Sequence, residues 1–256
     1  MHDARREGVR RGYDEIADRY LAARTTGGDL ALLPELVGRL SAGDAVLDAG
    51  CGAGVPVMTQ LVDADLEVVG IDLSTAQVRL ARSHSPGAHL AQADLVALPF
   101  GDRRFDGLVS YYAVIHVPRS EHRAVFDEFQ RVLVPGGVAL LCLGAGDVPE
   151  DDDTESWLGT HMFWSHFDAE TNLEMLQTAG FDIMRHELVK DPMYHGRHLF
   201  ALERSMPTTS RRAATSCVIT GTPAPQPASS TASPELRRAT SSGRSARSPP
   251  VVRAAR

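Results

Sequence analysis

Residues 46–54 read Val-Leu-Asp-Ala-Gly-Cys-Gly-Ala-Gly: a short apolar run, an acid, and three glycines at alternate positions. This spacing predicts a buried strand that ends in a tight turn and leads into a helix. Glycine suits both the sharp bend and the close approach of a ligand to the backbone. We therefore expect an adenosine-type cofactor at Gly50, Gly52 and Gly54.

Asp48 bears on which cofactor binds. A dinucleotide site presents a helix N-terminus and bare amides to a pyrophosphate, and a carboxylate beside them would repel that anion. S-adenosylmethionine has no phosphate and carries an ammonium and a sulfonium, so a carboxylate next to the turn suits it. The same carboxylate can instead lock the turn by accepting hydrogen bonds from backbone amides.

A second β-branched run, residues 66–72, ends at Asp72, eighteen positions after Gly54. An acid near that distance meets the ribose hydroxyls in nucleotide-binding units of this kind. Ser74 then predicts the N-cap of a helix that continues to about His84.

Three more apolar runs predict strands over residues 88–93, 105–112 and 138–143. Asp94 follows the first of them, where an acid can accept a hydrogen bond from the adenine amino group. Residues 131–137 predict the end of a helix and the start of the fifth strand, residues 138–143.

The chain resembles the class I S-adenosylmethionine-dependent methyltransferases of the small-molecule type over roughly residues 10–205. The matching elements occur in the family's order and are Asp48-Ala-Gly-Cys-Gly-Ala-Gly54, Asp72, Gln92-Ala-Asp94 with Leu98-Pro-Phe100, Phe105-Asp106, and Leu133-Val-Pro-Gly-Gly137. The resemblance implies an α/β Rossmann-like fold. Its seven-stranded sheet has the order 3-2-1-4-5-7-6, with strand 7 antiparallel and helices on both faces. The runs 181–190 and 197–204 predict the closing hairpin.

The resemblance also implies that S-adenosylmethionine is the cofactor and S-adenosylhomocysteine the product. It places the cofactor-binding positions at Tyr20, Asp48, Gly50, Gly52, Asp72, Leu73, Asp94, Leu95 and Tyr111. It says almost nothing about the methyl acceptor.

Residues 1–43 predict a helical lid ahead of the first strand. Tyr13, Ile16, Ala17 and Tyr20 recur at helical spacing and give one apolar face, and a second helix is expected over residues 29–40. The resemblance implies that Tyr20 reaches the methionine carboxylate and Tyr13 the acceptor pocket. The alternative is that both tyrosines pack and keep solvated hydroxyls.

The acceptor side is expected after the fourth strand and ahead of the sixth. His116 and His166 are the candidate catalytic residues, because a neutral imidazole can take a proton from a hydroxyl or an amine. Tyr112 and Trp164 are candidate substrate-binding residues. Strand alternation predicts that only one of Tyr111 and Tyr112 faces the cofactor side. The alternatives are a structural role for His116 and a loop-anchoring aromatic cluster around Trp164.

Other sites find little support in the sequence. His161, His166, His195 and His198 lack paired spacing to an acid or a cysteine, so no metal is expected. The three scattered cysteines argue against a disulfide framework. The stretch 144–157 is acidic and predicts an irregular insert.

Charge divides the chain into two parts. Residues 1–205, the expected methyltransferase domain, hold 18 basic and 32 acidic residues, a formal charge of −14, which disfavours a nucleic-acid partner. Residues 206–256 hold eight arginines and one acid and are rich in Pro, Ser and Ala, so we expect a disordered tail. The tail is expected to be either a basic arm for an anionic partner or an extension past the natural end of the protein near Arg204.

We expect a cytoplasmic enzyme with no membrane span and a small-molecule substrate. Direct displacement at an activated methyl group mainly requires alignment and exclusion of water. Two other functions remain open. One is a protein that holds the cofactor without methylating, as a cyclase or binding module. The other is a nicotinamide-dependent oxidoreductase, which Asp48 and the closing hairpin oppose.

Overall fold

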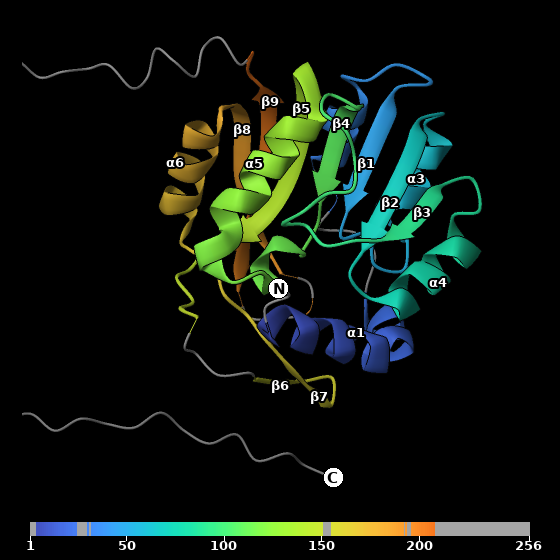
Figure 1. Cartoon of the computed structure of the whole chain (residues 1–256), viewed down its shortest axis with the longest axis vertical. Coiled ribbons are helices and arrows are strands. Elements are labelled where there is room, and N and C mark those ends of the chain that lie inside the picture. The colour runs from blue at the N-terminus through green and yellow to red at the C-terminus, as the bar shows by residue number, and fades with distance from the viewer. Residues whose placement is uncertain are drawn as a thin grey trace, which may run out of the picture. The chain divides into compact units, whose positions relative to one another are not determined.

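The computed structural model describes residues 4–24, 30, 32–150, 155–191, 193 and 196–207. A seven-stranded sheet runs in the order β3-β2-β1-β4-β5-β9-β8 (Figure 1). Its strands are β1 (Ala45–Ala49), β2 (Glu67–Asp72), β3 (His89–Gln92), β4 (Phe105–Ser110), β5 (Leu133–Gly144), β8 (Phe181–Lys190) and β9 (Arg197–Ser205). Only β9 runs antiparallel to its neighbours, so the predicted order, with β9 as seventh strand, is confirmed.

Helices cover both faces of the sheet and its carboxyl edge. They are α1 (Ala4–Ala23), α2 (Leu33–Val37), α3 (Val57–Asp63), α4 (Thr75–His84), α5 (His122–Val132) and α6 (Ala169–Ala179). Two short 3₁₀ helices, η2 (Val114–His116) and η3 (Arg119–Glu121), follow β4. None of the helices in the described ranges is long and apolar enough to cross a membrane.

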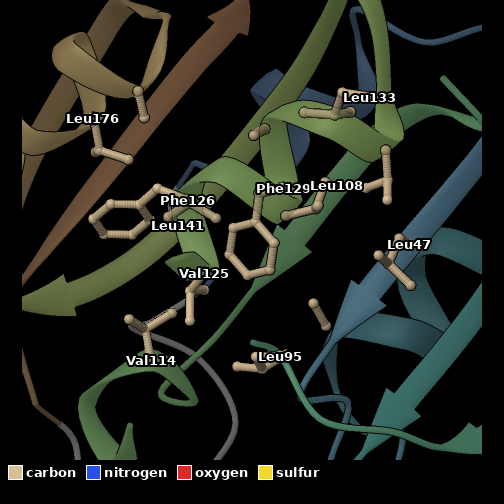
Figure 2. Packing of buried hydrophobic residues seen from close by; sticks show 14 of the residues in the cluster. Leu47, Leu95, Leu108, Val114, Val125, Phe126, Phe129, Leu133, Leu141 and Leu176 are labelled. Atoms are coloured by element: carbon tan, nitrogen blue, oxygen red, sulfur yellow. The ribbon is translucent and has the colours of Figure 1, made fainter. Parts of the chain in front are cut away.

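Two hydrophobic clusters hold the sheet between the helices. One packs α5 and α6 against it through Phe126, Phe129 and Leu176 (Figure 2), and the other packs α2 and α3 through residues such as Leu36 and Met58. Successive residues of a strand point to opposite faces, so each central strand supplies both clusters. The near-continuous apolar strands of the sequence follow from this burial on two sides.

The predicted cap at Ser74 is confirmed, and two further helix ends follow from the local sequence. Ser74 caps α4, since its hydroxyl accepts a hydrogen bond from the backbone N–H of Gln77 at 3.1 Å. Asp168 caps α6 in the same way by accepting from Thr171 N–H at 2.8 Å. Gly180 ends α6 with a φ of 102°, a left-handed conformation that glycine adopts without steric cost.

Four boundaries differ from the sequence predictions. β4 ends at Ser110 and not at Tyr112, because Tyr112 has a φ of 56° and leaves the extended conformation. β5 begins at Leu133, directly after α5. Of the second helix only α2 is present, and residues 29 and 31 of the predicted range lie outside the described residues. The predicted irregular insert, residues 144–157, ends in the short strand β6 (Glu155–Trp157), which pairs with β7 (Thr160–Met162) just beyond it, and residues 151–154 lie outside the described residues.

The helix α1 lies across the carboxyl edge of the sheet, with the β6–β7 hairpin on its outer side (Figure 1). The Asp14 carboxylate fastens it to the start of α4 by accepting from the Ser74 hydroxyl at 2.7 Å and from Ala76 N–H at 3.0 Å. The Thr160 hydroxyl donates to Glu15 at 3.1 Å from the other side. Open α/β sheets bind their ligands at this edge, so α1 covers the place where a ligand is expected.

Candidate active site

A cavity lies under α1 at the carboxyl edge and holds about 640 Å³ of empty space, counted out to its open mouth. Its walls come from α1, from the loops after β1 to β4, and from α4 and η2. The lining residues are Arg6, Val9, Tyr13, Tyr20, Gly50, Gly52, Asp72, Leu73, Gln77, Asp94, Leu95, Tyr111, Tyr112, Ala113, His116 and Val117.

The glycine turn forms the floor of the cavity. Gly50 and Gly52 have φ values of 88° and 52°, which side-chain-bearing residues rarely adopt. Asp72 locks the turn: one carboxylate oxygen accepts from Gly52 N–H at 2.9 Å and the other from Ser74 N–H at 2.8 Å. Asp72, rather than Asp48, thus takes the turn-locking role. Burial raises the pKa of Asp72 to about 6, against the lowering effect of these amides.

Asp48 is buried below the turn. Its side chain lines a neighbouring cavity together with Cys51 and Arg24, and its Oδ2 has no hydrogen-bond partner among the described residues. Burial, and then the charge of Asp72, raise the pKa of Asp48 to about 7. A buried carboxylate oxygen without a partner suits a cationic ligand group.

Tyr20 and Arg24 close this end of the site from α1 and the residue that follows it. Nη1 of Arg24 donates a hydrogen bond to the Tyr20 hydroxyl at 2.5 Å. The Arg24 guanidinium also lies 5.0 Å from the ring centre of Tyr112. Arg24 thus brings a cation to the place where the methionine carboxylate was expected. Arg24 was missed, although its position four residues after Tyr20 places both on one helix face.

The opposite end of the cavity carries Leu73, Leu95 and Asp94, the residues expected at the adenine and ribose. Asp94 lies beside Arg6, whose Nε is 3.1 Å from its Oδ2, and Arg6 also pairs with Glu121. The Arg6 side chain is 7% exposed, so the first turn of the lid brings a buried charge to this end. Nothing in the local sequence around Arg6 marks it for that position.

Tyr111 and Tyr112 both line the cavity, so the prediction that only one of them would do so is wrong. Strand alternation does not apply here because the extended backbone ends at Ser110 and Tyr112 is left-handed. A residue with such a backbone costs free energy, and functional sites are common places for it.

His116 lies in η2 and faces Tyr13 of the lid across the cavity. Its Nε2 is 2.9 Å from the Tyr13 hydroxyl and its Nδ1 is 2.8 Å from the carbonyl oxygen of Phe163. Burial lowers the pKa of His116 to about 4. The histidine therefore faces the predicted pocket, with both ring nitrogens already engaged.

Trp164 and His166 do not line the cavity. Trp164 lies behind His116, with ring centres 4.3 Å apart, and contacts Trp157 of β6. The Nδ1 of His166 faces the carbonyl oxygen of Gly146 at 2.7 Å, and its backbone pairs with Val148. The segment turns His166 toward the loop after β5, away from the expected convergence with His116.

A second polar pair at this edge was also missed. Nε2 of His198 lies 2.6 Å from Oδ2 of Asp191, where β8 ends and β9 begins, and the His198 ring packs edge-on against Tyr112 at 4.9 Å. Within the described ranges, no three His, Cys, Asp or Glu side chains gather as metal ligands would. His195 lies outside them.

The donor set fits S-adenosylmethionine. Asp72 offers carboxylate lone pairs beside the turn for ribose hydroxyls, Leu73 and Leu95 offer apolar contacts, and Asp48 offers a buried carboxyl group that can ionise. At Gly52 a β-carbon would meet nothing closer than Gln77 Oε1 at 3.9 Å, so the missing side chain leaves room for a ligand.

Comparison with known proteins supports this assignment. A family described as "Methyltransferase domain" matches residues 46–137. The chain is 37% identical over 102 residues to a 24-methylenesterol C-methyltransferase 2 of Oryza sativa subsp. japonica, covering 38% of this chain and 28% of that protein. It is 35% identical over 130 residues to a malonyl-[acyl-carrier protein] O-methyltransferase of Pseudescherichia vulneris, covering 50% and 51%. The chain thus spans about half of one relative and less of the other.

Solved structures share the fold at low identity. The [4+2]-cyclase SpnF superposes with a TM-score of 0.63 at 20% identity, over 78% of this chain and 97% of that one. A 1,6-didemethyltoxoflavin-N1-methyltransferase of Burkholderia thailandensis, solved with S-adenosylhomocysteine, gives 0.57 at 18% identity, over 81% and 92%. Sequence motifs, cavity and relatives agree: residues 46–137 match a methyltransferase domain, the fold is that of the class I S-adenosylmethionine-dependent methyltransferases, and S-adenosylmethionine is the cofactor.

Proposed function

We propose that this chain transfers the methyl group of S-adenosylmethionine to a small-molecule acceptor by direct displacement. The observation that carries the proposal is one continuous cavity in which the glycine turn and Asp72 face Tyr13, Tyr112 and His116. The cofactor supplies an activated methyl group on a sulfonium. The protein then has to align the two reactants and exclude water.

The lid supports exclusion of water. Arg6, Tyr13 and Asp14 fix α1 to three different parts of the sheet edge, namely Asp94, His116 and the start of α4. An acceptor held beneath this helix reacts in a site closed on several sides. Electrostatic contacts inside such a site are stronger than in water.

The lining of the cavity and the acidic charge of residues 1–205 favour a small acceptor. Its acceptor end is lined by Tyr13, Tyr112, Ala113, His116 and Val117, an aromatic and apolar surface with few polar atoms. The relatives include, by name, a 24-methylenesterol C-methyltransferase and a malonyl-[acyl-carrier protein] O-methyltransferase. Similar domains therefore act on acceptors of different chemistry. The formal charge of −14 over residues 1–205 disfavours a nucleic acid as acceptor. We place residues 1–205 in the methyltransferase domain.

The test is a transfer assay with methyl-labelled S-adenosylmethionine and a metabolite extract. We expect label in one or a few small molecules, and none with Asp72→Ala, which removes the carboxylate that locks the turn. Calorimetry should show binding of S-adenosylhomocysteine by the wild type. Cofactor binding without any labelled product would favour a protein that holds the cofactor for another purpose, such as cyclisation.

A further inference from the structure

A chain of two hydrogen bonds connects the loop ahead of α6 to the lid. The Phe163 carbonyl oxygen lies 2.8 Å from Nδ1 of His116, and Nε2 of His116 lies 2.9 Å from the Tyr13 hydroxyl. Phe163 and His116 are both buried, and Tyr13 and His116 line the cavity. Trp164 packs against the His116 ring, with the ring centres 4.3 Å apart.

The partners fix the direction of both hydrogen bonds. A carbonyl oxygen can only accept, so Nδ1 of His116 carries the hydrogen. Burial, with His166 and His198 nearby, lowers the pKa of His116 to about 4, so the ring is neutral at pH 7 and Nε2 carries a lone pair. Burial also raises the pKa of Tyr13 well above its ordinary value, so the phenol keeps its hydrogen and donates it to Nε2.

The Tyr13 oxygen therefore has no hydrogen left to give to a ligand. It can only accept, through the lone pairs that it turns toward the cavity. We propose that Tyr13 and His116 form a directional relay, and that the acceptor carries an O–H or N–H hydrogen on the atom that is methylated, rather than a carboxylate. This inference rests on the proposed methyl transfer and names its substrate class.

The relay accounts for the proton that the acceptor loses when it is methylated. The acceptor oxygen or nitrogen forms a bond to the methyl carbon, the bond between that carbon and sulfur breaks, and the electron pair stays on sulfur. The acceptor's proton passes to the Tyr13 oxygen while the Tyr13 proton passes to Nε2 of His116, which later returns it to solvent. A base this weak accepts the proton only as the new bond makes the acceptor strongly acidic. A carboxylate has no proton to pass and would face the lone pairs of Tyr13.

The assignment of hydrogens can be tested without knowing the acceptor. Nitrogen-15 NMR of the full chain with S-adenosylhomocysteine should show His116 as a neutral ring with hydrogen on Nδ1. In Tyr13→Phe, the Nε2 resonance should move because its hydrogen-bond donor is lost. A hydrogen on Nε2 in the wild type would overturn the proposal.

The substrate class is tested on labelled products from the metabolite extract. Methyl esters release methanol in mild alkali, whereas ethers and N-methyl groups keep their label, so we expect alkali-stable label. Alkali-labile label would overturn the inference while leaving methyl transfer intact, and no label at all would instead count against the proposed function. Tyr13→Phe and His116→Asn should each lower kcat roughly 100-fold while the cofactor Kd stays within about two-fold.

His122 provides the matched control. It is buried, one ring nitrogen faces the Val117 carbonyl at 3.0 Å, its pKa is lowered to about 4 by burial, and its side chain does not line the cavity. His122→Asn removes a similar histidine without touching the relay. Its folded fraction should keep kcat, and an equal loss of kcat in both histidine variants would show that His116 is only structural.

Discussion

Nε of Arg6 lies 3.1 Å from Oδ2 of Asp94, which joins the first turn of α1 to the end of β3. Asp94 was expected to accept a hydrogen bond from the adenine amino group. In the structure it also pairs with Arg6 and so helps to hold α1 in place. Arg6 also pairs with Glu121 ahead of α5. One buried guanidinium therefore links the lid to the end of β3 and to η3.

Arg6→Gln should loosen the lid. Removing one partner of a buried pair leaves Asp94 and Glu121 uncompensated, and we expect a loss of about 1–3 kcal/mol in the free energy of unfolding. Hydrogen exchange should speed up in α1 more than in the sheet, and S-adenosylhomocysteine should dissociate faster. Arg11→Gln is the control, because its side chain is 70% exposed on the same helix. Unchanged exchange in α1 would show that the ion pair does not hold the lid.

Asp48→Asn should weaken cofactor binding and increase the free energy of unfolding. The pKa of Asp48 is raised to about 7 in the folded protein, so its contribution to stability is present below its unfolded pKa and is lost as pH rises through about 7. The neutral amide avoids that loss. At pH 8 the variant should be more stable than the wild type by about 2–4 kcal/mol, and at pH 4 by little.

The same ionisation should govern binding of the cationic cofactor. Affinity of the wild type for S-adenosylmethionine should rise from pH 6 to pH 8 as Asp48 ionises, and Asp48→Asn should bind weakly with a flat profile. Calorimetry at several pH values measures both. Asp63→Asn, at an exposed position, should match the wild type. A wild-type affinity independent of pH would contradict this role.

Much of the fold could be predicted because its signals are local. The turn at Gly50 and Gly52, the acid at Asp72 and the caps at Ser74 and Asp168 each depend on a few neighbouring residues. What could not be predicted depends on residues far apart in the chain. Arg6 meets Asp94 and His198 meets Asp191 only after folding, and no local pattern marks them.

The acceptor side was predicted least well for the same reason. Tyr112 adopts a left-handed backbone conformation that no local sequence pattern predicts. His166 pairs through its backbone with Val148, and its side chain faces Gly146. His116 was placed correctly at the edge of the sheet. The Tyr13 partner that fixes its hydrogen-bonding direction comes from a helix about a hundred residues earlier in the chain.

Glu203→Gln should stabilise the protein at neutral pH. Glu203 is fully buried in β9, neither carboxylate oxygen has a hydrogen-bond partner among the described residues, and burial raises its pKa well above the ordinary value. Such a group favours folding only while protonated, so its contribution is lost as pH rises through the folded pKa. We expect a gain of about 1–3 kcal/mol at pH 8 and almost none at pH 4.

Denaturant unfolding at the two pH values measures this gain. The control is Glu67→Gln, because Glu67 is exposed at the start of β2 and its removal should change little at either pH. A destabilised Glu203→Gln at pH 8 would show that the carboxylate has a compensating partner and is ionised in the folded state.

Alanine substitutions at Gly43, Gly52 and Gly50 should separate the cost of backbone strain from the loss of space for the cofactor. Gly43 has a φ of 85° with nothing within 4 Å of an added β-carbon, so Gly43→Ala reports backbone strain alone, about 1 kcal/mol. Gly52→Ala should cost a similar amount of stability but lose most cofactor affinity, because its β-carbon would enter the cavity. Thermal unfolding and calorimetry give the two quantities.

Gly50→Ala should behave differently from both, since its β-carbon would lie 2.2 Å from the β-carbon of Ala113. That overlap forces the loop after β4 away from the turn, so both stability and cofactor affinity should fall, the former by about 2–4 kcal/mol. Adding Ala113→Gly should recover the part due to the overlap and leave the strain measured at Gly43. If the double variant recovers nothing, the contact between the two loops does not set the position of the turn, and the close packing of Gly50 on Ala113 has no role in forming the site.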